Sequence, residues 1–260
     1  MKKCIFSWFG YILPLPERVK LIRESGFDAT CLWWEDETYP NLIPVNDMPS
    51  IVRSAGLYID NIHCPYEGVN NLWHPDERIR IKEVQKYITY VDACILHRIP
   101  IMIMHATDEG FQKNHFKYGL ASFLEIIQYA EENYIKVAVE NTRDKEIVDY
   151  LLKEITSPFF GLCYDSSHDW IQGQSKGALL NTWKQRLFAT HLSDNNLLED
   201  MHWIPMDGLI QWMDVIPMIQ NSSIECITLE LMSSINKITD PKDFLDEAYH
   251  RLSFLLGAVI

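Results

Sequence analysis

Residues 161–170 read GLCYDSSHDW, an apolar run that ends in a charged residue. The run is typical of a strand that is covered on both faces, and Asp165 follows it at once. A buried carboxylate without partners shifts its pKa and loses its charge, so Asp165 requires partners from elsewhere in the chain. His168 stands three residues later, one helical turn past Asp165, and is the first candidate partner.

Seven further apolar runs of this kind occur along the chain, separated by longer amphipathic segments. The predicted strands span residues 4–8, 29–34, 58–63, 99–105, 136–141, 159–165, 187–194 and 226–231. Helical spacing predicts helices over 16–25, 76–97, 115–133, 208–220 and 240–257, with an interrupted pattern over 176–184. Eight strand–helix units predict an α/β fold, a (β/α)8 TIM barrel formed by residues 1–260 as a single domain. A doubly wound open sheet is the alternative, although no Gly-rich nucleotide-binding motif occurs.

Composition restricts the class of protein. Apolar residues make up 47% of the 260 residues, and no run approaches the roughly 18 apolar residues that a membrane helix needs. The formal net charge of −13 disfavours binding to nucleic acid or to an anionic membrane. Six scattered cysteines without a CxxC pair, and a first segment unlike a signal peptide, predict a reduced cytoplasmic protein. The helix patterns are compatible with a monomer or with a homo-oligomer.

An imidazole or a carboxylate occurs at the carboxyl end of six consecutive predicted strands. These residues are His63, His105, Glu140, Asp165, His191 and Glu230. The carboxyl ends of barrel strands converge on one face, where unpaired ionisable groups would be costly. A divalent cation would offset that cost, because carboxylates and neutral imidazoles are its ligands. Manganese, cobalt, magnesium and zinc all accept such a mixed set, and we expect one ion, or up to three if every candidate is a ligand.

Three more candidates lie close to these strand ends: His168, and Asp200 and His202 in the motif EDMHW. Nine candidates exceed the ligands of one ion, so either several ions bind or some of the nine contact substrate. Each residue has a structural alternative, such as a hydrogen-bonded core imidazole or a carboxylate paired with Lys or Arg. The regular placement at the ends of six strands argues against this alternative for the set as a whole.

Seven motifs run in order from the third strand to the eighth: IHCPYEGVNN, MIMHAT, VAVENT, GLCYDSSHD, ATHLSDN, DMHWIPMDGLIQW and TLELM. Together they resemble the xylose isomerase-like TIM barrel superfamily, which includes sugar isomerases, sugar epimerases and the endonuclease IV type of abasic-site repair enzyme. The resemblance implies a principal metal ion held by Glu140, Asp165, His191 and Glu230. In the epimerase branch the two glutamates are also the acid/base pair, His168 would bind a substrate oxygen, and the metal stabilises an enediolate.

The endonuclease branch implies another use of the same positions. It holds three zinc ions, and every one of its ligand positions is filled in this sequence. They are His63, His105, Glu140, Asp165, His168, His191, Asp200, His202 and Glu230. The Asp-x-His motif at 200–202 matches this branch, but Asp207 stands where it has Glu, and the ending GLIQW is closer to the isomerases.

Charge favours the isomerase over the nuclease. A nuclease grips phosphates with Lys and Arg, whereas the loop after the second strand, EDETYPNLIPVND, is acidic and has no basic residue. Metal-dependent isomerisation or epimerisation of a small polyhydroxylated carbonyl compound is therefore the predicted activity. A zinc phosphodiesterase acting on abasic-site DNA is the main alternative. A dehydratase is also compatible with the residues, whereas a non-catalytic sugar- or metal-binding relative is disfavoured because Glu140 and Glu230 are both present.

Aromatic side chains near the strand ends are the expected sugar contacts, since they can pack against the apolar faces of sugar rings. The candidates are Trp8, Phe9, Tyr11, Trp33, Trp34, Tyr66, Trp73, Trp170 and Trp203, of which we expect about three to touch substrate. Trp34, Trp203 and Glu35 are the residues chosen as substrate contacts together with His168, because a carboxylate beside an indole can accept hydrogen bonds from hydroxyl groups. Large aromatic residues also fill the gaps between helices and a barrel.

Overall fold

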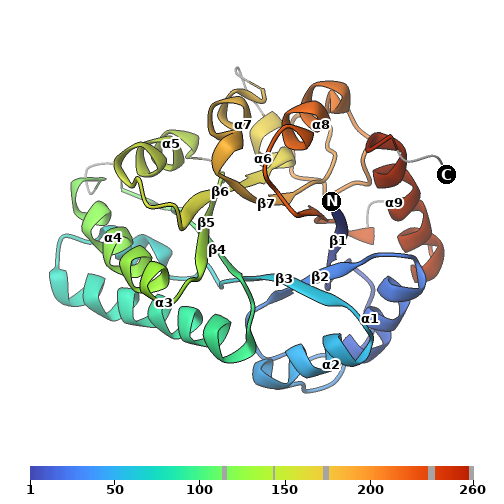
Figure 1. Ribbon diagram of the computed structural model, residues 1–260, viewed down its shortest axis with the longest axis horizontal. Helices are drawn as coiled ribbons and strands as arrows, with labels where there is room; N and C mark the ends of the chain where they lie inside the picture. The colour runs from blue at the N-terminus through green and yellow to red at the C-terminus, as the bar shows by residue number, and fades with distance from the viewer. Residues whose placement is uncertain (113–115, 143, 172–175, 234–237, 258–260) are drawn as a thin grey trace.

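Parallel strands form one closed sheet in the computed structural model, which describes residues 1–112, 116–142, 144–171, 176–233 and 238–257 (Figure 1). The strands are β1 (Lys2–Phe6), β2 (Ala29–Trp33), β3 (Tyr58–His63), β4 (Ile101–His105), β5 (Lys136–Glu140), β6 (Phe160–Asp165), β7 (Leu187–His191) and β8 (Cys226–Leu229). Their order is β7-β6-β5-β4-β3-β2-β1-β8, so each strand pairs with its neighbours in the sequence. The predicted (β/α)8 barrel is confirmed, and the doubly wound alternative is wrong because the strand order never reverses.

The barrel closes between β7 and β8 at the carboxyl ends of the two strands. Leu192 and Leu229 form an isolated parallel bridge there. The amide of Leu192 donates to the carbonyl of Thr228 at 2.9 Å, and the amide of Glu230 donates to the carbonyl of Leu192 at 3.1 Å. This seam is therefore built from a few hydrogen bonds directly beside the predicted ligand Glu230.

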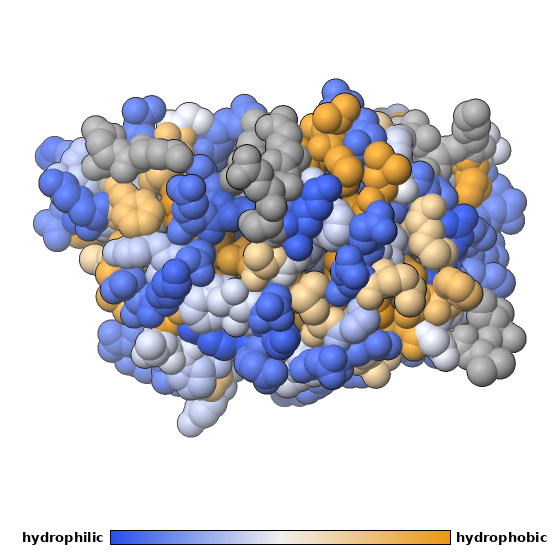
Figure 2. All heavy atoms as spheres, turned by 90° about the horizontal axis from the view of Figure 1, so that it is seen from above, coloured by the Kyte–Doolittle hydropathy of each residue, from blue (hydrophilic) through white to orange (hydrophobic). Residues whose placement is uncertain are grey.

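Helices surround the sheet and cover its outer face (Figure 1). They are α1 (Leu15–Glu24), α2 (Met48–Ser54), α3 (Glu77–His97), α4 (Phe116–Glu132), α5 (Lys145–Glu154), α6 (Ser166–Trp170), α7 (Ala178–Trp183), α8 (Trp212–Gln220) and α9 (Pro241–Leu255), with short 3-10 turns η1 (Val45–Asp47), η2 (Val69–Trp73) and η4 (Lys184–Arg186). Among the described residues, none of these helices is both long and apolar enough to cross a membrane. Hydrophilic side chains dominate the face shown in Figure 2, with apolar groups between them.

Local sequence signals set the ends of several helices. Asp76 precedes α3 and its side chain accepts the amide of Arg78, and Asp240 caps α9 in the same way. Gly26, just past α1, has a φ of +99°, a conformation that glycine adopts without strain. The predicted helix over 208–220 begins only at Trp212, because the preceding residues form an irregular loop. Residue 115, at the start of another predicted helix, lies outside the described residues.

The core has a large outer layer between strands and helices and a smaller layer inside the barrel. The inner layer is a buried cluster of Ile101, Ile103, Ala138, Cys163 and Ala189. All six cysteines are buried free thiols, as their apolar surroundings in the sequence predicted. On β5, β6 and β7 this inner layer consists of the small residues Ala138, Cys163 and Ala189, and the larger polar side chains follow at the strand ends.

Gly119 allows α4 to lie directly against the side chain of Trp73, so the stability of the fold should depend on this glycine. A Cβ atom on Gly119 would lie 2.0 Å from Cε3 of Trp73, which is fully buried and donates from its indole nitrogen to the carbonyl of Ala106 at 2.7 Å. Gly119→Ala should lower the free energy of unfolding by about 2 kcal/mol or more, although alanine favours helices by about 1 kcal/mol. Urea unfolding followed by circular dichroism measures this change.

Glu125→Ala is the control for Gly119→Ala, because Glu125 is exposed on the same helix. It should change the free energy of unfolding by less than about 0.5 kcal/mol. Equal stability of Gly119→Ala and the unmodified protein would show that Trp73 can move aside.

Candidate functional site

Alternation along the strands directs every second side chain into the barrel. On β4 to β7 the inner apolar cluster is followed, two positions later on each strand, by a polar residue. These residues are His105, Glu140, Asp165 and His191. The same periodicity that buries the cluster therefore directs four of the predicted site residues toward the axis at one end of the barrel.

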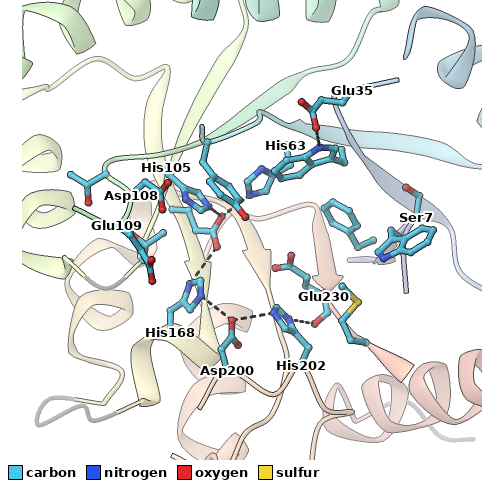
Figure 3. A pocket seen from close by; sticks show the side chains of 18 of the residues that line it. Ser7, Glu35, His63, His105, Asp108, Glu109, His168, Asp200, His202 and Glu230 are labelled. Atoms are coloured by element: carbon cyan, nitrogen blue, oxygen red, sulfur yellow. Dashed lines mark hydrogen bonds and ion pairs between the residues drawn. The ribbon is translucent and has the colours of Figure 1, made fainter. Parts of the chain in front are cut away.

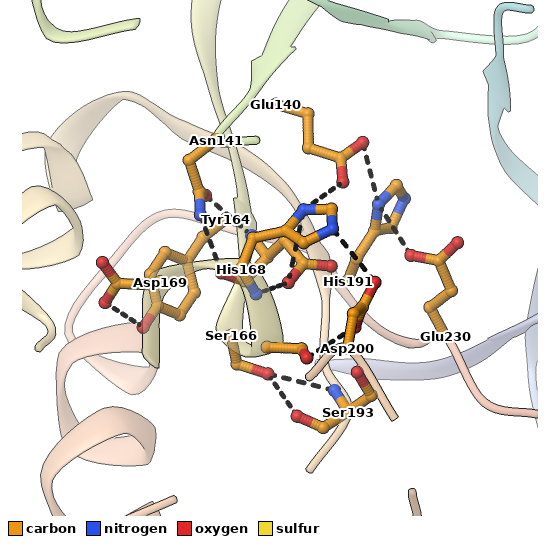
Figure 4. A network of polar contacts seen from close by, with 12 residues as sticks. Glu140, Asn141, Tyr164, Ser166, His168, Asp169, His191, Ser193, Asp200 and Glu230 are labelled. Carbon is orange, nitrogen blue, oxygen red and sulfur yellow. Dashed lines mark hydrogen bonds and ion pairs between the residues drawn. The ribbon is translucent and has the colours of Figure 1, made fainter. Parts of the chain in front are cut away.

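Four predicted ligands form the innermost part of the site: Glu140, Asp165, His191 and Glu230. Figure 4 shows Glu140, His191 and Glu230 directed toward one another. Each offers a donor atom, and these atoms all lie within 4.8 Å of one another. His191 Nδ1 is 3.2 Å from an oxygen of Glu140 and 3.2 Å from an oxygen of Glu230. Glu140, Asp165 and His191 are fully buried, whereas the side chain of Glu230 is 24% exposed. The structure thus brings together the four residues expected to hold the principal ion.

Asp165 has one well-bonded oxygen and one without a partner. Its Oδ1 accepts the amide of His168 at 2.6 Å, at the start of α6. Its backbone amide and carbonyl both bond to the side chain of Asn141 at 2.8 Å. Oδ2 is buried and has no hydrogen-bond partner among the described residues. Burial raises the pKa of Asp165 to about 7, and the charge on His168 opposes this rise.

Imidazoles surround the carboxylate of Glu140. The distances to its oxygens are 2.9 Å from His63 Nε2, 3.2 Å from His191 Nδ1, 3.5 Å from His105 Nε2 and 3.6 Å from His168 Nδ1. Burial raises the pKa of Glu140, but the charge on His191 and the hydrogen bonds from imidazoles outweigh it and hold this pKa well below its usual range. Glu140 is therefore charged in the folded protein, at the centre of the imidazoles.

Aromatic rings hold two of these imidazoles in place. The ring of His63 stacks on Trp33 with centroids 5.1 Å apart, and the ring of His105 stacks on Tyr66 at 4.7 Å. His63 Nδ1 lies 2.9 Å from the backbone carbonyl of the next residue, which only accepts, so Nδ1 carries a hydrogen. Nε2 of His63 consequently faces Glu140 in a fixed orientation.

A second polar group lies beside the first and consists of His168, Asp200 and His202 (Figure 3). Asp200 Oδ2 is 3.1 Å from His168 Nε2 and 3.0 Å from His202 Nε2, and Asp200 Oδ1 accepts the hydroxyl of Ser167 at 2.6 Å. Burial raises the pKa of Asp200, but hydrogen bonds from the two imidazoles lower it far more. Burial lowers the pKa of His202, but the bond to Asp200 reverses this and raises it to about 9.

A cavity of about 1200 Å³ opens above both groups (Figure 3). Nine acidic residues line it: Glu35, Asp36, Glu37, Asp108, Glu109, Glu140, Asp144, Asp200 and Glu230. Within the described parts of the chain, the lining contains no Lys or Arg. Trp8, Trp33 and Tyr66 are the members of the nine aromatic candidates that line the cavity. Contact between these aromatics and substrate stays a prediction.

Two of the residues chosen as substrate contacts lie outside the cavity. Trp34 stands one residue past β2, where alternation turns its side chain away from the barrel axis, and it is buried against His97 with ring centroids 5.5 Å apart. Trp203 does not line the cavity either. Glu35 does line it, and its carboxylate accepts the indole N–H of Trp33 at 2.6 Å. Trp33 thus lines the cavity whereas Trp34 does not, and contact of either tryptophan with substrate stays a prediction.

Asn141 and Ser167 support the site and were not singled out in the sequence. Asn141 joins β5 to β6 through its two bonds to Asp165, and Ser167 orients Asp200. Both stand beside predicted site residues, in VAVENT and GLCYDSSHD. Their position next to predicted ligands is the only sequence signal for these two residues. Spacing alone does not distinguish a supporting polar residue from any other polar neighbour of a ligand.

The chemistry of the innermost group fits a divalent cation. Asp165 Oδ2 is buried without a hydrogen-bond partner among the described residues, and buried polar atoms in native proteins are normally satisfied. Three carboxylates and one imidazole form a donor set that Mn²⁺, Co²⁺, Mg²⁺ and Zn²⁺ accept. His63, Glu140 and His191 form a second, overlapping group of donor atoms within 4.8 Å.

Comparison with known proteins identifies similar chains and folds. The family model described as "Xylose isomerase-like TIM barrel" matches residues 19–248. The uncharacterized protein y4fM of Sinorhizobium fredii is 26% identical over 254 residues, covering 82% of this chain and 81% of that protein.

Solved structures share the fold at low sequence identity. L-ribulose 3-epimerase has a TM-score of 0.78 at 13% identity, covering 98% of this chain and 94% of the other. D-psicose 3-epimerase of Clostridium cellulolyticum H10, solved with D-tagatose, has a TM-score of 0.77 at 16% identity, covering 98% of both chains. A D-tagatose 3-epimerase-like protein has a TM-score of 0.78 at 19% identity and the same coverage.

Cation binding to the innermost group should raise thermal stability, because it offsets repulsion between buried carboxylates. At about 100 times its Kd, Mn²⁺ should add about 2.7 kcal/mol to the folded state, which raises Tm by roughly 5–10 °C, and excess EDTA should reverse the increase. Asp165→Asn should lose most of this increase, because it removes the charge of the oxygen that has no other partner. Differential scanning fluorimetry with and without Mn²⁺ measures the shift.

Asp108→Asn is the control for Asp165→Asn. Asp108 lines the same cavity but does not belong to the innermost group, so its variant should keep the full Mn²⁺-dependent increase in Tm. A full increase in Asp165→Asn as well would place the cation elsewhere.

Proposed function

The chain belongs to the xylose isomerase-like TIM barrel family, and we propose that it is a divalent-metal-dependent isomerase or epimerase of a small polyhydroxylated carbonyl compound. One observation carries the proposal: two glutamates, Glu140 and Glu230, both lie 3.2 Å from His191 Nδ1 at the base of the cavity. Two carboxylates so placed suit a reaction in which one group removes a proton and another returns it. Solved structures of similar fold include epimerases of L-ribulose and D-psicose.

The proposed mechanism uses Glu140 and Glu230 as the acid/base pair. One of them removes the proton from the carbon beside the substrate carbonyl, which forms an enediolate, and the other delivers a proton to that carbon or its neighbour. A cation held by these two residues with Asp165 and His191 would supply positive charge where the enediolate oxygen becomes negative. Glu230 is the partly exposed member of the pair and has direct access to the cavity.

The other residues of the site bind and orient the substrate in this proposal. His168, Asp200 and His202 present hydrogen-bonding groups at the cavity wall, where they can bond to hydroxyl groups. Their contacts with one another and with Ser167 restrict their rotamers before substrate arrives. We also propose that residues 1–260 act as one domain and that the protein is cytoplasmic, as the sequence predicted.

A zinc phosphodiesterase acting on abasic-site DNA is the second candidate function. The observation that favours it is the close placement of all nine residues that match the endonuclease ligands, including His63 and His105 beside Glu140. The acidic lining opposes it, because DNA phosphates would meet carboxylates and, in the described part of the lining, no Lys or Arg. A dehydratase would use the same base and cation, and product analysis separates it from an epimerase.

Glu230→Gln tests the acid/base role. It should lower the rate of ketose epimerisation, and of deuterium incorporation from D₂O, by about 10²–10⁴-fold, because the amide cannot exchange a proton. Suitable substrates are L-ribulose, D-psicose and D-tagatose, followed by nuclear magnetic resonance. Glu225→Gln is the matched control, since Glu225 is exposed just before the amino end of the same strand. Persistent deuterium incorporation by a folded Glu230→Gln would remove Glu230 from the mechanism.

Metal content separates the two candidate functions. Protein purified without chelator should contain about one Mn, Co or Mg per chain, because the isomerase proposal uses one ion and leaves His63, His105, Asp200 and His202 for substrate. Inductively coupled plasma mass spectrometry gives this ratio. Three zinc ions per chain, together with salt-sensitive cleavage of an abasic-site duplex, would support the phosphodiesterase instead.

A further inference from the structure

The loop between β7 and α8 is folded around one buried carboxylate, Asp194, which has no part in the chemistry proposed above. Oδ1 of Asp194 accepts the amides of Asn195 at 2.9 Å and Ile210 at 3.1 Å. Oδ2 accepts the amide of Met206 at 2.8 Å and the indole N–H of Trp212 at 2.7 Å. Asp194 is fully buried, and no ion pair to it occurs among the described residues. Four N–H donors therefore replace the water that this charge lost on folding.

Close packing around this carboxylate restricts the loop further. A Cβ atom on Gly208 would lie 2.3 Å from Asp194 Oδ1 and 2.3 Å from the carbonyl oxygen of Asn195, so glycine is needed here. The amide of Leu209 donates to that same carbonyl at 2.9 Å. Donors from residues 195, 206, 210 and 212 thus converge on one side chain and close the loop on itself.

The closed loop carries Asp200 and His202, and it holds His202 in a conformation that L-residues rarely adopt. His202 has a φ of +47° and Met206 a φ of +76°. A backbone conformation of this kind is stable only when surrounding contacts hold it in place. Here each of the two residues lies at or next to a hydrogen bond with Asp194. Trp203, which follows His202, exchanges two backbone bonds with Asp194 at 2.8 and 3.0 Å, and the Met206 amide bonds to the carboxylate.

His202 in turn contacts the end of β8. Its Nδ1 lies 3.2 Å from the carbonyl oxygen of Glu230, and its own carbonyl accepts the amide of Met232 at 3.0 Å. The loop therefore connects the ends of β7 and β8 at the seam where the two strands share an isolated bridge. Asp194, His202 and Glu230 form one continuous chain of contacts across the barrel mouth.

We propose that Asp194 is a positioning residue, which sets His202 and, through it, Glu230 by holding the 195–212 loop against the β7–β8 seam. The expected change in ketose turnover rests on the proposed function, whereas the expected change in backbone exchange does not. Loss of the Asp194 charge should loosen both His202 and Glu230 without removing any group that touches substrate or a cation.

Asp194→Asn, tested in the full-length protein, has three expected results. Hydrogen–deuterium exchange, measured by mass spectrometry, should become at least about tenfold faster in peptides covering 195–212 and also in those covering 226–232. The Kd for Mn²⁺ should rise about 10-fold, as for other groups that support metal ligands. At saturating Mn²⁺, kcat for the ketose should stay within about threefold of the unmodified protein while KM remains raised, because the reacting groups are intact and His202 is displaced.

Two further variants keep the test decisive. Glu83→Gln replaces another buried carboxylate, on α3, and should leave exchange in both peptides and the Mn²⁺ affinity unchanged. If Asp194→Asn does not fold, Trp212→Phe removes one of the four donors and should change exchange and Kd in the same direction by about two- to fivefold.

Each outcome of this experiment has one meaning. Faster exchange confined to 195–212 would overturn the connection to Glu230, and unchanged exchange in both peptides would overturn the proposal entirely. Absence of ketose turnover by the unmodified protein would contradict the proposed function but leave the exchange result valid. Equal effects of Glu83→Gln and Asp194→Asn would indicate general destabilisation and overturn a positioning role.

Discussion

Three carboxylates and an imidazole with donor atoms within 4.8 Å of one another are the constraint on which the rest of the barrel mouth depends. Two like charges about 4 Å apart repel by roughly 4 kcal/mol at an effective dielectric constant of 20, and burial adds to that cost. The structure offsets this in two ways. Four imidazoles surround Glu140 and keep it ionised, whereas Asp165 retains a buried oxygen without a partner and a pKa raised to about 7. The protein alone thus balances the charge on Glu140 but leaves Asp165 unsatisfied, which is the reason to infer a cation.

The need to hold these groups explains the polar residues around them. Asn141 fixes the backbone of Asp165 between β5 and β6, Ser167 orients Asp200, and Asp194 organises the loop that presents His202. Glu230 differs from the other three ligand candidates because it stands just past β8, at the seam closed by a single bridge. Its position therefore depends on loop contacts more than on sheet pairing. This placement leaves Glu230 3.2 Å from His191 and also gives its carboxylate access to the cavity, where substrate would bind.

The sequence predicted the barrel and the convergence of six candidates because both follow from periodicity. Consecutive apolar residues mark strands covered on both faces, and an ionisable residue stands at the carboxyl end of each strand from the third to the eighth. Periodicity alone does not decide between Trp33 and Trp34, because the choice requires knowing which of the two side chains faces the cavity, and in the structure this is Trp33. Helical spacing of apolar residues also predicts a helix over the loop before Trp212, which is irregular in the structure. Four hydrogen bonds to the Asp194 side chain shape this loop, and no local sequence pattern reveals them. Tertiary hydrogen bonds to a buried charge override such local patterns.

The cavity wall decides between substrates more clearly than the ligands do, because the ligand positions suit both branches of the family. Glu35, Asp36 and Asp108 line the cavity, and only Glu37 beside them pairs with an arginine, Arg18, so the lining keeps an excess of negative charge among the described residues. An anionic phosphodiester would therefore lose electrostatic energy on approach. A neutral polyol carries no such cost. Its hydroxyl groups are donors for the carboxylates, and its C–H faces are apolar surfaces for the indoles that share the lining. Carboxylates alternating with aromatic rings are thus complementary to the two kinds of surface that a sugar presents, whereas the duplex of a DNA substrate presents mainly charge.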